Sequence, residues 1–367
     1  MQKNKGNLAI VLPRGTSFGP KRATSIDLCV HDFVTPSRYA GSTQIHATRV
    51  EQPFPGFDLR FDDGGWGGQM AKAFRIARRI RSDCADMTVV HQHLPSAFIL
   101  SKMLPHPVLL HAHNFHKGMA PSVQRFLKHW RYSSLAGLIF VSEVCRNDFQ
   151  KKWPDVTIPT FVVHNGLDLS LWSPAPEKHN RILVVARAAP DKGVLEAAQA
   201  LQAILPRLPG WTALMILSEV DRYPAYYAQV QDLVKASNGT IVIETSQPHP
   251  VVRKATEESA IALVPSKWDE PFGRTAIEAH AGGAALVSSG RGGLREVSGD
   301  SCLYIDPDDS GEIAATILKL ATEDSFRHSL ASRGQERVTT HYDIRNVCCK
   351  LDDIYQKYMN PGSYRTI

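Results

Sequence analysis

Short apolar runs alternate with longer amphipathic segments along most of this chain. The runs predict strands at Leu8–Leu12, Met87–Val90, Val108–Leu110, Leu138–Val141 and Phe161–Val163, and in a second series at Ile182–Val185, Ala213–Leu217, Ile241–Ile243, Ile261–Val264 and Ala284–Val287. Continuous rather than alternating apolar runs are typical of parallel strands covered by helices on both faces. Segments with helical periodicity lie between them, at Ala71–Arg81, Leu195–Leu205 and Glu312–Ala321. This alternation predicts a doubly wound α/β fold.

The strand series restarts near residue 180, after a polar and proline-bearing segment, LWSPAPEK at 171–178. Such a segment is typical of a linker between domains. The sequence therefore predicts two Rossmann-like domains, at residues 1–172 and 180–340. Because ligands of such sheets bind at the carboxyl ends of the strands, we expect the site in a cleft between the two domains.

Length and composition fit this organisation. The 367 residues suffice for two domains that each bury a core. Six scattered cysteines without a CxxC pair indicate neither a zinc site nor a disulfide framework, and a reducing cytoplasm fits them best. No apolar run approaches the roughly 18 residues of a membrane span. We expect a soluble cytoplasmic protein, or one on the surface of a membrane.

The charge is distributed unevenly along the chain. Residues 1–180 hold 22 Lys and Arg against 13 Asp and Glu, whereas residues 181–367 hold 20 against 23. A basic front half indicates an anionic partner such as phosphate, lipid headgroups or nucleic acid. Ordinary solubilising charge is the alternative explanation.

The strongest motif is PSKWDEPFGRTAIEAHA at residues 265–281, directly after the predicted strand Ile261–Val264. It places Glu270 in a loop and Glu278 on the helix that follows. Free amides at the start of that helix, together with its dipole, form an anion site. Carboxylates beside such a site suit sugar and ribose hydroxyls, which donate hydrogen bonds to them. Taken alone, two glutamates eight residues apart are weak evidence, since solvated glutamates are common on helices.

The complete string resembles the E-x7-E motif of the family 4 retaining glycosyltransferases. The resemblance implies that Glu270 contacts the transferred sugar and Glu278 the ribose of a nucleotide-sugar donor. The residues between them that would also bind the donor are Phe272, Gly273, Arg274 and Thr275. Family members often have Leu or Met in place of Arg274, and an apolar residue in place of His280. Neither change touches the two carboxylates.

A second string, VVARAAPDKG at residues 184–193, resembles the "GR…KG" segment of the same family, with Ala186 in place of the usual glycine. The resemblance implies that Arg187 and Lys192 hold the donor diphosphate. Fixed cations stabilise the charge that develops on a nucleoside diphosphate as it leaves. A surface Arg and Lys in an ordinary loop is the alternative interpretation.

Further matches extend the resemblance over nearly the whole chain. HNGLD at residues 164–168 is similar to the family's "NGvD" string, and Val141-Ser142 to its "vS". The segment from Tyr342 to Tyr358 resembles the closing helix, placed at 341–360, which in this family returns to the first domain. The family fold is GT-B, with two Rossmann-like domains facing a cleft. The loop RGTSFGPK at residues 14–21 resembles the family's glycine-rich loop near the donor phosphates and the acceptor, in which Gly15 and Gly19 could serve, with Gly19 assigned to the donor.

Histidines gather after two predicted strands, as HQH at residues 91–93 and HAHNFH at 111–116. Two HxH patterns suggest zinc, but neither Cys nor carboxylate joins them at ligand spacing. Histidines that line a cleft wall are the simpler interpretation. In the family, a histidine at the end of this strand lies near the reacting sugar. His113 matches that place best, and His111 is its competitor.

One acidic string, DPDD at residues 306–309, is similar to the metal motif of single-domain glycosyltransferases. It directly precedes the predicted helix at Glu312, so we expect it to cap that helix instead. With no other ligand cluster, we expect the protein to need no catalytic metal and no cofactor.

These observations predict a retaining glycosyltransferase that moves a sugar from a UDP-, GDP- or ADP-sugar to a glycan or lipid-linked acceptor, with His113, Arg187, Lys192 and Glu270 in catalysis. Charge and family favour lipopolysaccharide core or surface polysaccharide as the product, with no nucleic acid partner. The alternatives are a nucleotide-sugar epimerase of the same fold and a non-catalytic sugar- or nucleotide-binding protein.

Two basic and partly apolar segments of the first half, Lys72–Arg81 and Lys117–Arg131, suggest a peripheral association with an anionic membrane. The alternative is that their apolar residues face the domain core and their cations face water.

Overall fold

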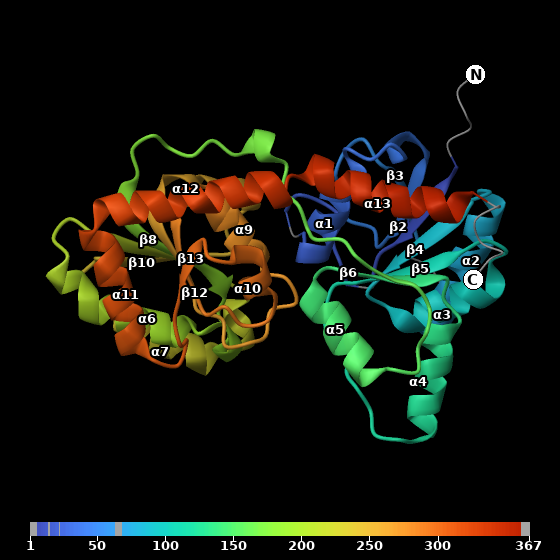
Figure 1. Ribbon diagram of the computed structural model, residues 1–367, viewed down its shortest axis with the longest axis horizontal. Helices are drawn as coiled ribbons and strands as arrows, with labels where there is room; N and C mark the ends of the chain where they lie inside the picture. Colours follow the sequence, from blue (N-terminus) through green and yellow to red (C-terminus); the bar gives the residue numbers. More distant parts are fainter. Residues whose placement is uncertain (1–5, 14, 22, 63–67, 361–367) are drawn as a thin grey trace. The chain divides into compact units, whose positions relative to one another are not determined.

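The computed structural model describes residues 6–13, 15–21, 23–62 and 68–360, which leaves Arg14 of the predicted glycine-rich loop outside the described residues. The chain forms two compact units, described separately here (Figure 1). Unit 1 comprises Met1–Gly166 and Ile344–Ile367, and unit 2 comprises Leu167–Asp343. No helix in the described part of the chain is long and apolar enough to cross a membrane.

Unit 1 is built on a parallel seven-stranded sheet with the order β3-β2-β1-β4-β5-β6-β7. Its strands are β1 (Leu8–Val11), β2 (Thr43–Ala47), β3 (Asp58–Phe61), β4 (Met87–His91), β5 (Val108–Ala112), β6 (Gly137–Phe140) and β7 (Thr160–Val162). Its helices are α1 (Ser25–Val34), α2 (Gln69–Ser82), α3 (Leu94–Met103), α4 (Val123–Ser133), α5 (Glu143–Lys152) and α13 (Ile344–Met359).

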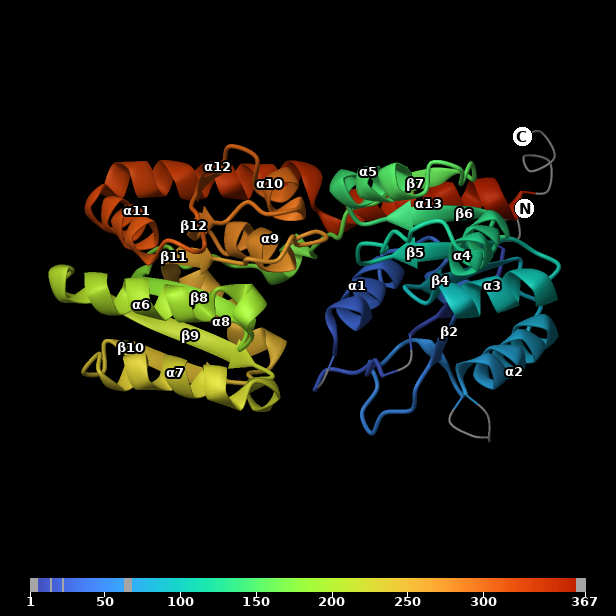
Figure 2. The same ribbon diagram turned by 90° about the horizontal axis from the view of Figure 1, so that it is seen from below.

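Helices cover both faces of this sheet. On one face, α1 and α13 pack together over the strands, and Val347, Leu351 and Tyr355 of α13 belong to the same buried core as the residues of β1. On the other side, α3 contacts both α2 and α4. Figure 2 shows these three helices in succession along the sheet. The strands are therefore shielded from water on both faces, as their continuous apolar runs predicted.

Unit 2 has a parallel six-stranded sheet with the order β10-β9-β8-β11-β12-β13. Its strands are β8 (His179–Arg187), β9 (Thr212–Ser218), β10 (Ile241–Thr245), β11 (Ser259–Val264), β12 (Ala285–Ser288) and β13 (Cys302–Tyr304). Its helices are α6 (Val194–Ile204), α7 (Pro224–Lys235), α8 (His249–Glu258), α9 (Arg274–Ala281), α10 (Gly293–Ser298), α11 (Ser310–Thr322) and α12 (Asp324–His341). Apolar residues of α6, α7 and α11 form the main core on one face, and α8 covers the other.

The predicted doubly wound α/β architecture is confirmed. Each strand expected from an apolar run is present, whereas β2, β3 and β13 were not predicted. β2 mixes polar and apolar residues, β3 is an edge strand with two charged residues in four, and β13 has only three residues. Such strands are held by pairing with a neighbour, which a local apolar pattern does not reveal.

Candidate functional site

The loops at the carboxyl ends of β8 and β11 bring Lys192 and Glu270 together. Lys192 ends a short 3-10 turn, Pro190–Lys192, that follows β8, and Glu270 lies in the loop after β11. The Lys192 Nζ lies 2.5 Å from Glu270 Oε1, and both side chains are largely buried. The buried Ser266 hydroxyl donates to the same oxygen at 2.9 Å. Ser266 was not among the predicted site residues, because a serine after a strand carries no signal of its own.

Backbone contacts fix these two loops to each other. The amides of Lys267 and Trp268 both donate to the Asp191 carbonyl, at 2.9 and 3.0 Å. Gly193 has a left-handed backbone, and a Cβ on it would overlap the carbonyl oxygen of Pro265. Glycine is therefore required here, both for the backbone angle and for the close approach of the second loop.

Arg187, at the end of β8, is held by a different set of partners. Its guanidinium lies 3.2 Å from Asp191 and 3.7 Å from Glu219, and the side chain is one-third exposed. The partners of Arg187 and Lys192 are thus separate carboxylates. Neither Asp191 nor Glu219 was predicted to contact Arg187.

The helix α9 begins after Gly273, which has a left-handed backbone and provides no side-chain cap. Arg274 and the half-buried Thr275 form its first turn. Glu278, one turn later, is buried and its Oε1 accepts from Arg274 Nε at 2.9 Å. The same oxygen lies 3.1 Å from Nε2 of His249, at the start of α8.

Burial raises the pKa of Glu278, but the hydrogen bonds and positive charge of His249 and Arg274 outweigh this effect and hold the pKa below its ordinary value. Glu278 is therefore an ionised acceptor in a buried position. His249 was not predicted, since it comes from another helix and the string PHP at residues 248–250 resembles no motif. Arg274, where the family often has an apolar residue, balances the charge of this glutamate.

A glycine-bearing loop after β12 packs against the backbone of Glu270. Gly293 N donates to the Glu270 carbonyl at 2.6 Å, and a Cβ on Gly292 would overlap the backbone of Asp269 and Glu270. In the sequence, the RGG string at residues 291–293 could have indicated this close approach of two backbones. Phe272 is buried and packs edge-on against Tyr342, at 5.7 Å between ring centroids. It supports the loop from within unit 2.

The acidic string before α11 caps that helix, as expected. The Asp309 side chain accepts from the amides of Gly311 and Glu312, at 2.8 and 3.0 Å. Asp308 is paired with Lys267 Nζ at 2.6 Å and with Arg291 at 3.2 Å. These contacts give the string a structural role, as part of an ion-pair network.

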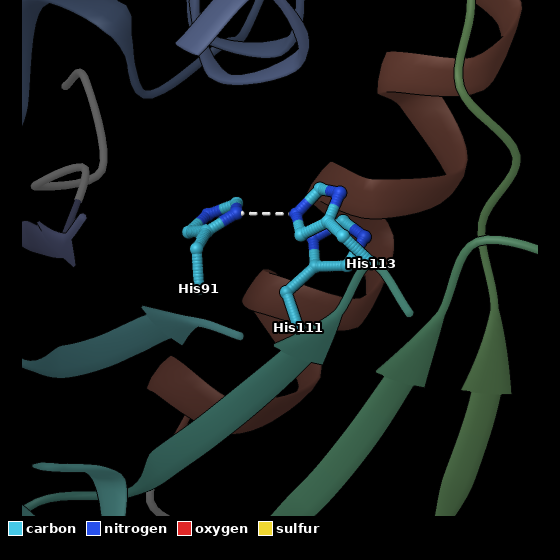
Figure 3. A group of neighbouring side chains, drawn as sticks. All are labelled: His91, His111 and His113. Atoms are coloured by element: carbon cyan, nitrogen blue, oxygen red, sulfur yellow. Dashed lines mark hydrogen bonds between the residues drawn. The ribbon is translucent and has the colours of Figure 1, made fainter. Parts of the chain in front are cut away.

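In unit 1, three histidines meet at the carboxyl ends of β4 and β5 (Figure 3). His91 Nδ1 lies 2.8 Å from His113 Nε2, and His111 stacks on His113 with 4.6 Å between ring centroids. Gln92 holds the loop, since its Oε1 accepts from the amides of His113 and Asn114 at 2.7 and 3.0 Å.

Burial lowers the pKa of each of these histidines, to about 3 for His113, and repulsion from the neighbouring rings adds to this effect for His91 and His111. All three are therefore neutral at pH 7. His111 is completely buried, whereas His113 keeps 9% of its surface exposed. Of the two histidines that were candidates for the place near the reacting sugar, His113 is the more exposed to solvent.

One ring nitrogen from each histidine lies within 4.8 Å of the others, which is close enough to ask whether they hold a metal. A metal ion binds in the plane of an imidazole ring. The rings of His111 and His113 are within 20° of parallel, so their planes do not meet at a shared ion. A ring must turn before both can ligate one ion, and the need for no metal stays a prediction.

The loop that contains Gly19 is organised by Asp27 of α1. The completely buried Asp27 carboxylate accepts from Ser17 N at 3.0 Å and from Thr24 N at 2.8 Å. Gly19 is buried against the backbone of Gln52. Asp27 was not predicted, because an acidic residue in the first turn of a helix is common.

The two basic helices of unit 1 orient their apolar residues in opposite ways. On α2, the residues spaced as one helical face are buried, although Phe74 is half-exposed; the buried ones are Ala73, Ile76, Ala77 and Ile80. On α4, the corresponding face is exposed, with exposed fractions of 75% for Val123, 69% for Phe126, 41% for Leu127 and 47% for Trp130. Most apolar residues of α2 thus face the core, whereas Val123, Phe126 and Trp130 of α4 face outward.

Comparison with known proteins matches residues 172–337 to the family described as "Glycosyl transferases group 1". The chain is 27% identical over 202 residues to a glycogen synthase of Mycobacterium tuberculosis, covering 53% of this chain and 47% of that protein. It thus spans about half the length of that relative. It is 24% identical over 304 residues to a phosphatidyl-myo-inositol mannosyltransferase of Mycolicibacterium smegmatis, covering 76% of this chain and 73% of the relative. It is 22% identical over 236 residues to a lipopolysaccharide 1,2-N-acetylglucosaminetransferase of Salmonella typhimurium, covering 59% and 61%.

Solved structures share the fold over nearly the whole chain. A glycosyltransferase from Rickettsia africae superposes with a TM-score of 0.79 at 16% identity, covering 98% of this chain and all of the other. The Anabaena protein HepE, in complex with UDP and glucose, superposes with a TM-score of 0.76 at 16% identity, covering 96% of this chain and all of the other. At this level of identity the likeness concerns the fold, which is GT-B.

Proposed function

We propose that this chain, whose residues 172–337 match the family of group 1 glycosyl transferases, transfers a sugar from a nucleotide-sugar donor to a glycan or lipid-linked acceptor with retention of configuration. The observation that carries the proposal is the buried pair of Lys192 and Glu270, at 2.5 Å, formed by two loops at the carboxyl edge of the unit 2 sheet. That edge is where ligands of doubly wound sheets bind.

The pair provides one group for each part of the donor. Lys192, with Arg187 at the end of β8, binds the diphosphate and stabilises its charge as the glycosyl bond breaks. Glu270 then accepts hydrogen bonds from the sugar hydroxyls. Without ligand these two side chains satisfy each other. Donor binding replaces one charge-assisted contact by two of the same kind, so neither charge is left buried and unpaired.

Glu278 serves the ribose in this proposal. As an ionised and buried acceptor, oriented by Arg274 and His249, it suits two neighbouring hydroxyl donors. The start of α9, at Gly273 to Thr275, directs its amides and its dipole at the phosphates. Phe272 keeps the preceding loop in place by packing on Tyr342.

The reaction itself needs no enzyme nucleophile. The acceptor oxygen bonds to the anomeric carbon on the face from which the nucleoside diphosphate leaves, and the acceptor proton passes to a β-phosphate oxygen. His113 contributes as a neutral hydrogen-bonding group near the sugar, since burial holds its pKa at about 3. No metal ion or other cofactor takes part in this proposal.

We place the acceptor on unit 1 and the enzyme at the cytoplasmic surface of an anionic membrane, acting in lipopolysaccharide core or surface polysaccharide synthesis. The named relatives include a mannosyltransferase acting on a phosphatidylinositol and a lipopolysaccharide transferase. The outward apolar face of α4 also supports a membrane role, because Val123, Phe126 and Trp130 are exposed on a helix that carries several cations. Exposed aromatic residues beside cations are typical of helices that lie on anionic membranes.

The experiment that tests the function combines binding and turnover. UDP, GDP, ADP and their sugars are screened by thermal shift, since a ligand of the native state raises the melting temperature. The nucleotide-sugar that stabilises the protein is then supplied with acceptor extracts, and release of nucleoside diphosphate is measured. Binding without any release of diphosphate would favour a non-catalytic binding protein, and interconversion of free nucleotide sugars would favour an epimerase.

A further inference from the structure

A cavity of about 470 Å³ lies within unit 1, under the helix α4. We call it the α4 cavity. One wall is the start of α3 with Gln92 and His93, the second is the loop after β5, and the third is the inner side of α4. Its volume is in the range of small-molecule sites.

Three cations line this cavity, namely Lys117, Lys128 and Arg131, and its lining contains no Asp or Glu. Within the described residues, none of the three forms an ion pair with a carboxylate. Lys128 Nζ donates to the Lys117 carbonyl at 2.8 Å, and Arg131 is half-buried. A set of cations without counter-charge indicates a site for an anion.

The neighbouring Arg125 shows what a structural cation on α4 looks like. It donates to the carbonyls of Met119 and Lys152, both at 3.1 Å, and packs on the Trp153 ring. Arg125 also lies 3.8 Å from the Asp155 carboxylate. Lys128 lies over the same Trp153 ring, at 5.1 Å to its centroid, but it has no such carboxylate among the described residues, and burial, followed by the charges of Lys117 and Lys152, lowers its pKa. A bound anion would remove that penalty, whereas Arg125 needs none.

The rest of the lining combines neutral donors with apolar groups. His93 Nδ1 accepts from Ser96 N at 3.2 Å, so the proton of the neutral ring is on Nε2, available as a donor. Burial lowers the pKa of His116 to about 4, which makes it neutral as well. The apolar side chains are Leu94, Phe115, Met119 and Leu127. The cavity therefore suits a ligand that is anionic at one end and apolar at the other.

We propose that the α4 cavity binds a phosphate group of the acceptor, with Lys128 and Arg131 as its principal ligands and Lys117 at its rim. This inference rests on the proposed function and adds the chemical class of its acceptor. A phosphate monoester carries about −1.5 to −2 charge at pH 7, which matches converging cations better than a single carboxylate does. Gln92 links the cavity to the proposed reacting centre, because it lines the cavity and also holds the amide of His113.

Calorimetric titration of the full chain tests the proposal with two probes that share a phosphate monoester. Glycerol 3-phosphate has no acyl chain, whereas dihexanoylphosphatidic acid, used below its micelle concentration, has two. We expect both to bind the wild type and both to lose at least about tenfold in affinity in the Lys128→Gln, Arg131→Gln double variant, on the scale of removed charge-assisted hydrogen bonds. Tighter binding of the acylated probe identifies a lipid-borne phosphate, and equal binding identifies a free one.

The matched control is Lys151→Gln, which removes an exposed cation of α5 that does not line the cavity. It should bind both probes as the wild type does. Equal affinities in the wild type and the double variant, or an equal loss in the control, would overturn the proposal. Thermal melting of each variant verifies that unit 1 is folded. Nucleotide binding by unit 2 is measured in parallel, so a failed donor assignment appears as absent nucleotide binding with phosphate binding intact.

Discussion

The carboxyl edges of the two sheets are polar in different ways. In unit 2, the functional charges are paired within the protein: Lys192 with Glu270, and Arg274 with Glu278. In unit 1, the edge is occupied by neutral, stacked histidines, and the cations of the α4 cavity have no carboxylate partner among the described residues. One edge balances its own charge, whereas the other leaves positive charge for a ligand to balance.

Under the proposed function, this difference fits unit 2 for the donor and unit 1 for the acceptor. A nucleotide-sugar presents a diphosphate and hydroxyls, so a site for it needs both signs of charge close together. Each residue of a pair can then release its partner and bind a ligand group in its place, without large rearrangement. An acceptor with a phosphate needs only positive charge, and neutral histidines beside it avoid attracting that phosphate into the reacting position.

The largest effect is expected from breaking the pair in unit 2. Lys192→Ala should lower the turnover number at least about a hundredfold, the usual scale for one preorganised group that stabilises developing charge. Arg187→Ala should act similarly, and Lys235→Ala, which removes an exposed lysine of α7, should not. Steady-state rates of diphosphate release provide the measurement. Near-normal turnover of the Lys192 variant would disprove the phosphate role.

A second comparison separates the two glutamates of unit 2. Glu278→Ala should weaken binding of the free nucleoside diphosphate about tenfold, since it loses the charged acceptor for the ribose. Glu270→Ala should leave that affinity nearly unchanged and impair use of the sugar. Calorimetry with the nucleoside diphosphate provides both affinities. If both variants bind it as the wild type does, Glu278 does not hold the ribose.

Acid should destabilise unit 1 through its buried histidines. His113 has a pKa of about 3 in the folded protein against 6.5 in an unfolded chain, so the unfolded state binds the additional proton once the pH falls below about 6.5. Each such histidine then costs on the order of 1 kcal/mol of unfolding free energy per pH unit, and the loss ends below the folded pKa. Urea unfolding at pH 7 and pH 5 measures this dependence. His113→Asn should reduce the slope by the contribution of one histidine, whereas His328→Asn, at an exposed position, should leave it as steep as in the wild type.

Vesicle binding tests whether the exposed apolar face of α4 contacts membranes in a way that α2 does not. Sedimentation with anionic vesicles should decrease severalfold in Phe126→Ser, Trp130→Ser, because these side chains are exposed. The charge reversals Arg78→Glu, Arg79→Glu and Lys128→Glu should also weaken it, and salt should have the same effect. Val251→Ser, which removes an exposed apolar side chain of α8 in unit 2, serves as the matched control with a small expected change. Equal sedimentation with neutral and anionic vesicles, or none with either, would leave α4 without a membrane role.

The smallest expected effect is that of a chelator. The proposed reaction needs no metal ion, so EDTA should leave the transfer rate unchanged. Among the described residues, His91, His111 and His113 are close enough to share an ion only if a ring turns. Activity lost on chelation and restored by manganese would point instead to the histidines of unit 1, in a turned arrangement.

Much of the fold was predictable from the sequence because its interior strands are locally apolar. The residues proposed to bind the donor, Arg187, Lys192, Glu270 and Glu278, stand within two recognisable strings, so the sequence could name them, and their roles stay predictions. Their partners were not predictable. His249 and Ser266 reach their glutamates through the packing of separate elements. Such pairings depend on tertiary contacts, which a pattern along the sequence does not reveal.

Unit 1 was less predictable for the same physical reason. The helical periodicity of α2 and α4 is alike, and only the packing decides that one apolar face is covered and the other is not. The cavity under α4 depends on three segments separated in sequence. Its cations appeared in the sequence only as part of a basic stretch, with no indication that they converge.

The helix α13 affects the order in which the two units complete their folding during synthesis. Its Asp352 accepts from the Ser37 hydroxyl at 2.6 Å, across 315 positions of the chain, and its apolar residues complete the core of unit 1. A ribosome therefore releases every strand of unit 2 before unit 1 has its last helix. The half that is synthesised first finishes folding last, and until then its sheet exposes an apolar face to whatever chaperones are near the exit tunnel.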